Sequence, residues 1–157
     1  MRAFGYRRHG SIDKLTLVEI PEPELKRHSV IVDVHSVGLN PLDYRIRRGE
    51  LGPLALTKST KLCCSDFSGV IAAVGLSVED VKVGDPVYGM TFQPLVGTSA
   101  QKIRVHQNVV SPKPCNLSHA EASVVPLAAL TALQALKYLA QLQRGQRVLI
   151  NGASGGV

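Results

Sequence analysis

The chain of 157 residues has no tryptophan, and aromatic residues make up only 4% of it, so aliphatic side chains must supply most of any core. Its three cysteines are an odd number without the spacing of a disulfide framework, which predicts reduced thiols in a cytoplasmic protein. No uncharged apolar run reaches the roughly eighteen residues that a membrane helix needs, so we expect no membrane span. Charged residues are also scarce, at 19%, which argues against disorder. These shortages leave a globular domain as the predicted class.

Positive charge is in excess, with 18 basic against 12 acidic residues and a net charge of +6. The basic residues are scattered along the chain, and the densest group is Arg45, Arg47 and Arg48. This pattern fits a solvated basic face, or one that meets a phosphate-bearing cofactor. A nucleic-acid partner is not expected, because the charges form no continuous patch.

The first part of the chain is predicted to be rich in short strands. Val30, Val32 and Val34 recur at every second position, which is the period of a half-buried strand. Gly69 is expected to allow a bend or a close approach inside another strand. Turns with glycine or proline separate these segments, which predicts a compact β-barrel-like unit. The other expected strands lie within residues 1–6, 67–74, 83–88 and 101–105.

The pattern becomes helical near Ser118, which forms a capping box with Glu121. Pro126 can start the next helix as its first residue. An apolar stripe follows, which predicts a largely buried helix with Gly145 as its C-terminal cap. The stripe consists of Ala129, Leu133, Leu136 and Ala140.

The last residues combine an apolar run with a glycine-rich loop. Residues 148–150 (VLI) predict a strand, and the glycines after it allow a backbone to approach a pyrophosphate closely. A tail of glycine and serine is by itself often only a flexible end. We expect the residues from about 146 onward to be disordered or to pair with another molecule, because the helix and strands of such a domain would lie past Val157. The loop candidates for cofactor binding are Gly152, Ala153, Ser154, Gly155, Gly156 and Val157.

Six motifs occur in one order along the chain: residues 37–43 (VGLNPLD), 48–49 (RG), 66–69 (DFSG), 83–85 (VGD), 126–132 (PLAALTA) and 149–157 (LINGASGGV). With these motifs the chain resembles the zinc-lacking quinone oxidoreductases, the zeta-crystallin-like branch of the medium-chain dehydrogenase/reductase superfamily.

The resemblance implies a mainly β GroES-like catalytic domain over residues 1–117. Residues 118–157 would then be a helical connector, followed by the first strand and glycine-rich loop of a truncated α/β Rossmann domain. It also implies NADPH as cofactor, a small quinone or enone as substrate, and a homo-oligomer for the full-length protein. The 157 residues alone are expected to be inactive, because most cofactor contacts would lie beyond them.

The residues that match zinc ligands in zinc-dependent relatives have changed type. Those relatives carry Cys where this chain has Asn40, and Gly-His-Glu where it has residues 64–66 (CSD). Zinc needs three or four converging nitrogen, sulfur or oxygen ligands, and the five histidines show no paired spacing. We therefore expect no metal.

Three side chains are candidates for the reaction site. Asn40 before Pro41 is typical of a turn, while the resemblance gives it a contact with nicotinamide or substrate. Thr131 can bond a carbonyl one turn back in its helix, while the resemblance places it beside the nicotinamide ring. Tyr44 is an ordinary rim residue in one interpretation and a catalytic proton donor to an oxyanion in the other. Asp43 is interpreted as structural.

Two alternative functions remain open from the sequence. An enoyl-thioester reductase would use the same cofactor on a different conjugated substrate. A non-catalytic interaction or RNA-binding module would use the positive charge, although a charge total has little specificity.

Overall fold

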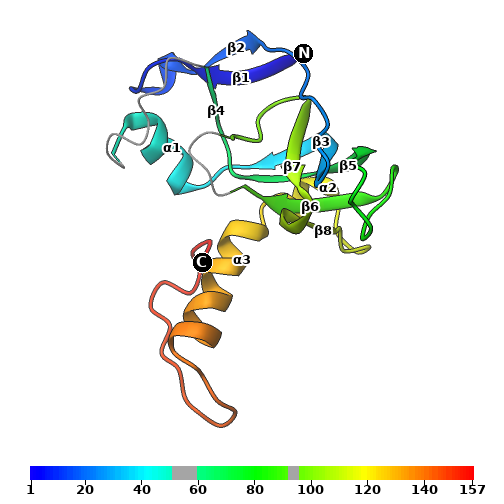
Figure 1. Ribbon diagram of the computed structural model, residues 1–157. Coiled ribbons are helices and arrows are strands. Elements are labelled where there is room, and N and C mark those ends of the chain that lie inside the picture. The colour runs from blue at the N-terminus through cyan, green and yellow to red at the C-terminus, as the bar shows by residue number, and fades with distance from the viewer. Residues whose placement is uncertain (51–59, 92–95) are drawn as a thin grey trace.

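The computed structural model describes residues 1–50, 60–91 and 96–157, and these form a mainly β domain from which a helical segment projects (Figure 1). The smaller sheet has three antiparallel strands in the order β2-β1-β4. Its strands are β1 (Arg2–Tyr6), β2 (Thr16–Glu19) and β4 (Lys61–Leu62), and the short helix η1 (Ile12–Lys14) precedes β2.

The larger sheet has five antiparallel strands in the order β7-β3-β5-β6-β8. An isolated bridge pairs Ala3 of the smaller sheet with Ala100, which lies just before a strand of the larger sheet. The strands are β3 (Ser29–Gly38), β5 (Asp66–Val74), β6 (Pro86–Met90), β7 (Lys102–His106) and β8 (Val110–Pro112), with the short helix η3 (Gln107–Val109) before β8. The strands expected from residues 1–6, 30–34, 67–74, 83–88 and 101–105 are therefore confirmed.

The core lies between the strands and is almost entirely aliphatic. Val30, Val32, Ile71 and Val87 are at most 1% exposed, and Phe67 is the one aromatic residue of the buried cluster among the described residues. The alternation along β3 thus directs one set of valines into the core, as the two-residue period predicts. This aliphatic packing is the consequence of a sequence with few aromatic residues.

Gly69 is required by close contact between β3 and β5. A Cβ atom at this position would lie 2.0 Å from the carbonyl oxygen of Asp33, well inside contact distance. The register between the two strands shifts between Val34 and Ser36, beside this contact. The expected close approach at Gly69 is confirmed.

Two helices connect the large sheet to its surroundings. Helix α1 (Pro41–Arg48) follows β3 directly, and α2 (His119–Ala122) packs against β3 and β5. The backbone N–H of Glu121 donates to the Ser118 hydroxyl at 3.2 Å, and the backbone N–H of Ser118 donates to the Glu121 carboxylate at 2.8 Å. This reciprocal pair confirms the predicted capping box.

The second helical segment differs from the expectation in its burial. Helix α3 (Pro126–Leu133) continues into a π-helical stretch, η4 (Gln134–Leu139), and projects away from the sheets (Figure 1). Only Pro126 of this segment is buried, while Leu133 is 47% exposed. The apolar stripe correctly predicted a helix. The prediction that this helix is largely buried was wrong, because only its first turn packs against the β domain.

The end of this segment also differs from the prediction. The helical run stops at Ala140 because Gln141 adopts a left-handed backbone, with φ of 48°. Gly145, with φ of 89°, sits in a separate turn and is not the cap. Residues 148–150 form no strand, since the described chain offers no neighbouring strand to complete their hydrogen bonds. Within the described ranges, no helix is both long and apolar enough to cross a bilayer.

Candidate functional site

The buried carboxylate of Asp66 connects the starts of two helices. Asp66 opens β5 and is fully buried. Its Oδ2 accepts a hydrogen bond from the Asn40 side-chain amide at 2.9 Å, and Asn40 is the N-cap residue of α1. Its Oδ1 accepts from the backbone N–H of Leu127, in the first turn of α3, at 3.0 Å. One carboxylate therefore holds α1, β5 and α3 in a fixed relation.

The same network extends to Thr131. Its hydroxyl donates to the carbonyl oxygen of Leu127 at 2.7 Å, one turn back in α3. Asn40 and Thr131, predicted from separate motifs, are thus joined through Asp66 and Leu127. We call Asn40, Asp66, Leu127 and Thr131 the Asp66 network. Asp66 was not among the predicted site residues, although it opens the 66–69 motif and is a charged residue at the start of an apolar strand.

Asp43 has the structural role expected of it. One of its carboxylate oxygens accepts from the backbone N–H of Asn40 at 2.7 Å, and the other accepts from the Ser65 hydroxyl at 3.2 Å. The first bond belongs to a capping box at the start of α1. The turn interpretation of Asn40 is also confirmed, because it is the N-cap residue.

Burial shifts the acidity of both carboxyl groups. Burial raises the pKa of Asp66 from 3.8 to about 6, although hydrogen bonds from Asn40 and Leu127 oppose the rise. Burial also raises the pKa of Asp43, against hydrogen bonds from Asn40 and Ser65. Desolvation disfavours the charged form, whereas donors stabilise it. The Asp66 carboxyl group should therefore lose its proton as the pH rises through about 6.

Tyr44 and the loop residues lie at the surface, as does Thr131. Tyr44 is 45% exposed, and the guanidinium of Arg48 lies 5.2 Å from its ring centroid. Residues 152–157 are exposed, and the hydrogen bond found among them in the described chain is local, from Gly155 N–H to the carbonyl of Gly152 at 2.9 Å. The structure thus brings Asn40 and Thr131 into one network, and neither Tyr44 nor the loop is bonded to that network.

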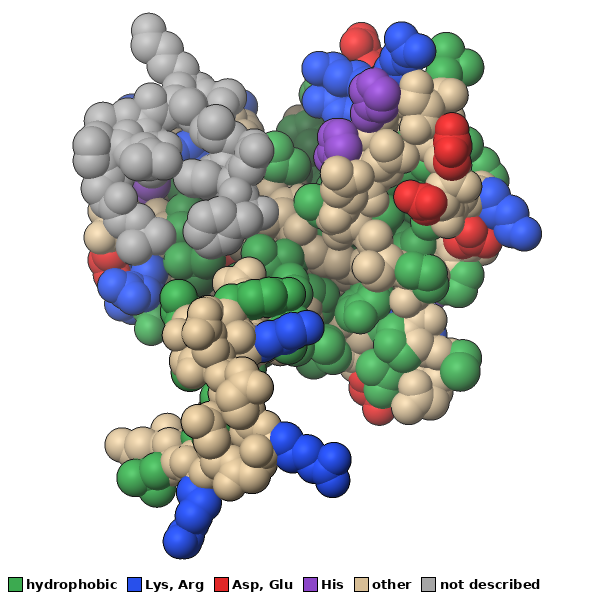
Figure 2. Space-filling view, turned by 60° about the horizontal axis from the view of Figure 1, so that its bottom comes forward, with side chains coloured by type: hydrophobic (Ala, Val, Ile, Leu, Met, Phe, Trp, Pro, Cys, Tyr) green, Lys and Arg blue, Asp and Glu red, His purple; other side chains and the backbone are tan. Residues whose placement is uncertain are grey.

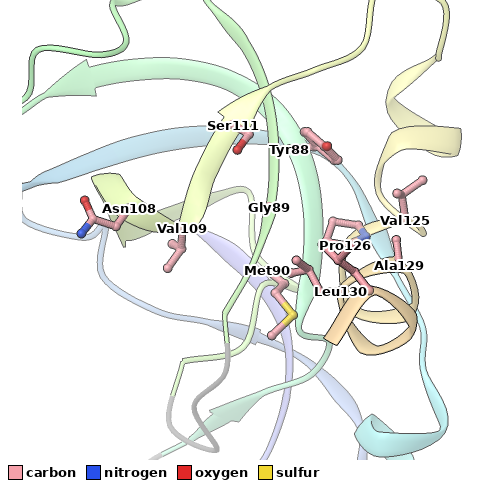
Figure 3. Close-up of a pocket in the computed structure, with 11 residues that line it drawn as sticks. Tyr88, Gly89, Met90, Asn108, Val109, Ser111, Val125, Pro126, Ala129 and Leu130 are labelled. Carbon is pink, nitrogen blue, oxygen red and sulfur yellow. The ribbon is translucent and has the colours of Figure 1, made fainter. Parts of the chain in front are cut away.

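An apolar pocket of about 520 Å³ lies beside the start of α3. Met90 from β6 and Leu130 from α3 line it, and Val109 closes its other side (Figure 3). Figure 2 shows hydrophobic side chains gathered on the β domain around the base of the projecting helical segment. A concave apolar surface next to a few fixed polar groups is the usual form of a small-molecule site.

The three cysteine thiols are free, and burial suppresses the ionisation of two of them. Burial raises the pKa of Cys63 to about 11 and that of Cys64 to about 12. Cys64 is buried, Cys63 is partly buried and Cys115 is exposed. Among the described residues, no group of three or more His, Cys, Asp or Glu side chains could hold a metal ion.

The structure is thus an antiparallel β domain with a buried polar network and an apolar pocket. The chain belongs to the family of alcohol dehydrogenase GroES-like domains, whose profile matches residues 26–133. The resemblance to quinone oxidoreductases of the medium-chain dehydrogenase/reductase superfamily is confirmed by relatives and by solved structures. The domain boundary between residues 117 and 118, expected from the sequence, remains a prediction.

Two curated relatives and one solved structure illustrate the similarity. The chain is 33% identical to the chloroplastic quinone-oxidoreductase homolog of Spinacia oleracea, aligning over 100% of this chain and 50% of that protein. It is 31% identical to the chloroplastic NADPH-dependent alkenal/one oxidoreductase of Arabidopsis thaliana, over 100% of this chain and 42% of that protein. An alcohol dehydrogenase superfamily protein from Novosphingobium aromaticivorans is 36% identical, with a TM-score of 0.90, over 99% of this chain and 47% of that one. The chain therefore spans about half the length of these relatives.

Proposed function

We propose that the chain forms the substrate-side part of an NADPH-dependent reductase that acts on quinones or conjugated carbonyl compounds. The proposal rests on the Asp66 network, which joins Asn40 to Thr131, and on the apolar pocket at the start of α3. The names of its relatives, a quinone-oxidoreductase homolog and an NADPH-dependent alkenal/one oxidoreductase, support the same chemistry.

The free hydrogen-bonding atoms of the site fit a nicotinamide carboxamide. Thr131 uses its proton on Leu127, so its hydroxyl oxygen remains an acceptor for an amide N–H₂ group. Asn40 uses an amide hydrogen on Asp66, and its side-chain oxygen, which accepts from the Asp43 N–H in the capping box, keeps a second lone pair as an acceptor. In the loop, Gly152 has φ of 72°, and no atom of the described residues lies within 4 Å of where a Cβ would stand, so a ligand can approach its backbone.

NADPH, when bound, supplies a hydride to the substrate. In our proposal the hydride adds to the β-carbon of an enone, and the electron pair of the double bond moves to the carbonyl oxygen as an enolate. Protonation of the enolate completes the saturated ketone. The Tyr44 hydroxyl is the proposed proton donor, and it is accessible because the side chain is 45% exposed. Within the network, Asp66 and the Leu127 backbone position Asn40 and Thr131, and Asp66 does not itself react.

The test uses the full-length protein and follows NADPH consumption with a quinone, an enone and an enoyl thioester. We expect Thr131→Val to raise KM for NADPH about fivefold, because the loss of a hydrogen bond costs roughly 1 kcal/mol. Tyr44→Phe should lower kcat about 100-fold, as expected for the loss of a general acid. The matched controls, Thr16→Val and Tyr138→Phe, change exposed residues outside the site and should leave both constants unchanged.

Each result has a separate meaning. Failure of NADPH oxidation with all three substrates would contradict the proposed function. Equal rates for Tyr44→Phe and Tyr138→Phe would remove Tyr44 from the mechanism while leaving the reaction intact. A much higher kcat/KM with the enoyl thioester would make the protein an enoyl-thioester reductase.

A further inference from the structure

A basic groove lies at the opposite end of β3 from the Asp66 network. Its volume is about 510 Å³, and it is formed by the turn before β3 and the end of β7. Ser29 opens β3, whereas Gly38 ends it just before Asn40. Ten strand residues span roughly 30 Å, so this groove is separate from the proposed reductase site. The residues that line the groove are Lys26, Arg27, His28, Ser29, Arg104, Val105 and His106.

The local fold explains why positive side chains collect here. Residues at alternate positions of β7 share a face, so Arg104 and His106 point outward while Val105 enters the core. In the pairing of β3 with β7, Ser29 lies opposite His106. The turn that carries Lys26 is closed by the Ser29 N–H, which donates to the Lys26 carbonyl at 3.0 Å.

The two guanidinium groups are held by neutral oxygen atoms. Arg27 Nε donates to the Ser77 hydroxyl at 2.8 Å, and an Arg104 Nη donates to the backbone carbonyl of Glu24 at 3.0 Å. In the described chain, no ion pair involves Lys26, Arg27 or Arg104. Lys102, the next outward residue of β7, differs because it pairs with the Glu22 carboxylate at 3.4 Å. The groove therefore keeps its positive charge in a fixed arrangement.

The histidines add hydrogen-bond donors on the same surface. His28 and His106 are stacked, with ring centroids 6.4 Å apart and an angle of 24° between planes. The backbone N–H of Asn108 donates to His106 Nδ1 at 3.2 Å, which leaves Nε2 of the neutral ring to carry the proton. Nε2–H is then a donor to a ligand.

We propose that this groove binds an oligophosphate, a small anion with two or more linked phosphate groups. Fixed guanidinium groups match phosphate oxygens in bidentate geometry, and linked phosphates supply the several charges that three unpaired cations require. A long nucleic acid would need a continuous track of charge. The other dense basic group, on α1, follows the far end of β3, and there Arg45 is paired with Glu50 at 3.2 Å.

Calorimetric titration of the chain with inorganic tripolyphosphate tests the proposal. We expect one saturable site whose affinity falls as salt concentration rises. Arg104→Gln should weaken binding at least about tenfold, because it removes a charge-assisted hydrogen bond. Arg27→Gln provides the same test without changing the bond to Glu24, and circular dichroism confirms that each variant folds. Arg45→Gln, on α1, is the matched control and should change the affinity less than about twofold.

Two further ligands separate the sources of the phosphate. Equal affinity for ATP and tripolyphosphate would identify the phosphate chain as the whole ligand, and tighter binding of ATP would add recognition of the base. Both outcomes support the site. Absence of saturable binding at millimolar tripolyphosphate would overturn it. The proposal would also be overturned if Arg45→Gln weakened tripolyphosphate binding as much as Arg104→Gln does. The same holds if single-stranded RNA bound more tightly than tripolyphosphate and both substitutions weakened the RNA binding equally. Either result would indicate a diffuse basic surface.

Discussion

Replacing Asp66 with asparagine should change how the stability of the protein depends on pH. Burial raises the pKa of Asp66 from 3.8 to about 6 in the folded protein. The folded state therefore binds more protons than the unfolded state between about pH 4 and pH 6, and stability falls as pH rises through this window. A difference of about two pKa units, at about 1.4 kcal/mol each, corresponds to roughly 3 kcal/mol. Asp66→Asn carries no titrating carboxyl and should lack this loss.

Urea unfolding followed by circular dichroism at several pH values between about 4 and 7 measures the effect. The difference in unfolding free energy, Asp66→Asn minus wild type, should increase by roughly 3 kcal/mol from the lowest pH to the highest. This change is expected whether the variant is more or less stable than wild type at any one pH. Asp43 titrates in both proteins, so its contribution largely cancels. Asp80→Asn, which changes an exposed carboxylate, should show no such trend. A pH-independent difference for Asp66→Asn would refute the assignment of Asp66 as a buried, desolvated carboxylate.

Three further substitutions test the fold. Gly69→Ala would place a Cβ 2.0 Å from the Asp33 carbonyl oxygen, so we expect a loss of about 3 kcal/mol in urea unfolding, and a loss below about 1 kcal/mol would contradict the close contact. Cys64 has φ of 64°, so Cys64→Gly should be about 1 kcal/mol more stable than Cys64→Ala, and the reverse order in thermal unfolding would exclude backbone strain there. Burial, His35 and Lys113 lower the pKa of His119, so wild type should lose stability relative to His119→Gln as pH falls below about 6.5, and parallel pH profiles would disprove this.

The strands were predictable because their sequences carry the two-residue period directly. The alternating valines of β3 and the glycine in β5 needed no knowledge of distant residues to indicate a buried face and a close contact. The capping box at Ser118 was equally local, since its partner lies three residues away. Features that depend only on residues close together in the sequence can therefore be predicted from the sequence.

The network and the exposure of α3 were not predictable, because both depend on long-range packing. Asp66 and Leu127 are 61 residues apart, and nothing in either segment identifies the carboxylate as the partner of an α3 backbone amide. The apolar stripe predicted that α3 is a helix, but it could not show which part of the protein packs against that helix. Residues 148–150 likewise had strand-forming side chains, but a strand also needs a neighbour with which to pair. Asn40 and Thr131 were identified by resemblance alone, whereas the hydrogen bonds that join them through Asp66 and Leu127 are seen only in the folded structure.

Isotope transfer by the full-length protein tests the central claim most directly. NADPH carrying deuterium at the transferred position of its nicotinamide ring is supplied with a conjugated enone, and the product is analysed by mass spectrometry and NMR. The account predicts one deuterium on the β-carbon of the saturated ketone, and a much lower rate of its formation in Tyr44→Phe than in Tyr138→Phe. Oxidation of NADPH that leaves the ketone unlabelled, or no oxidation at all, would contradict it.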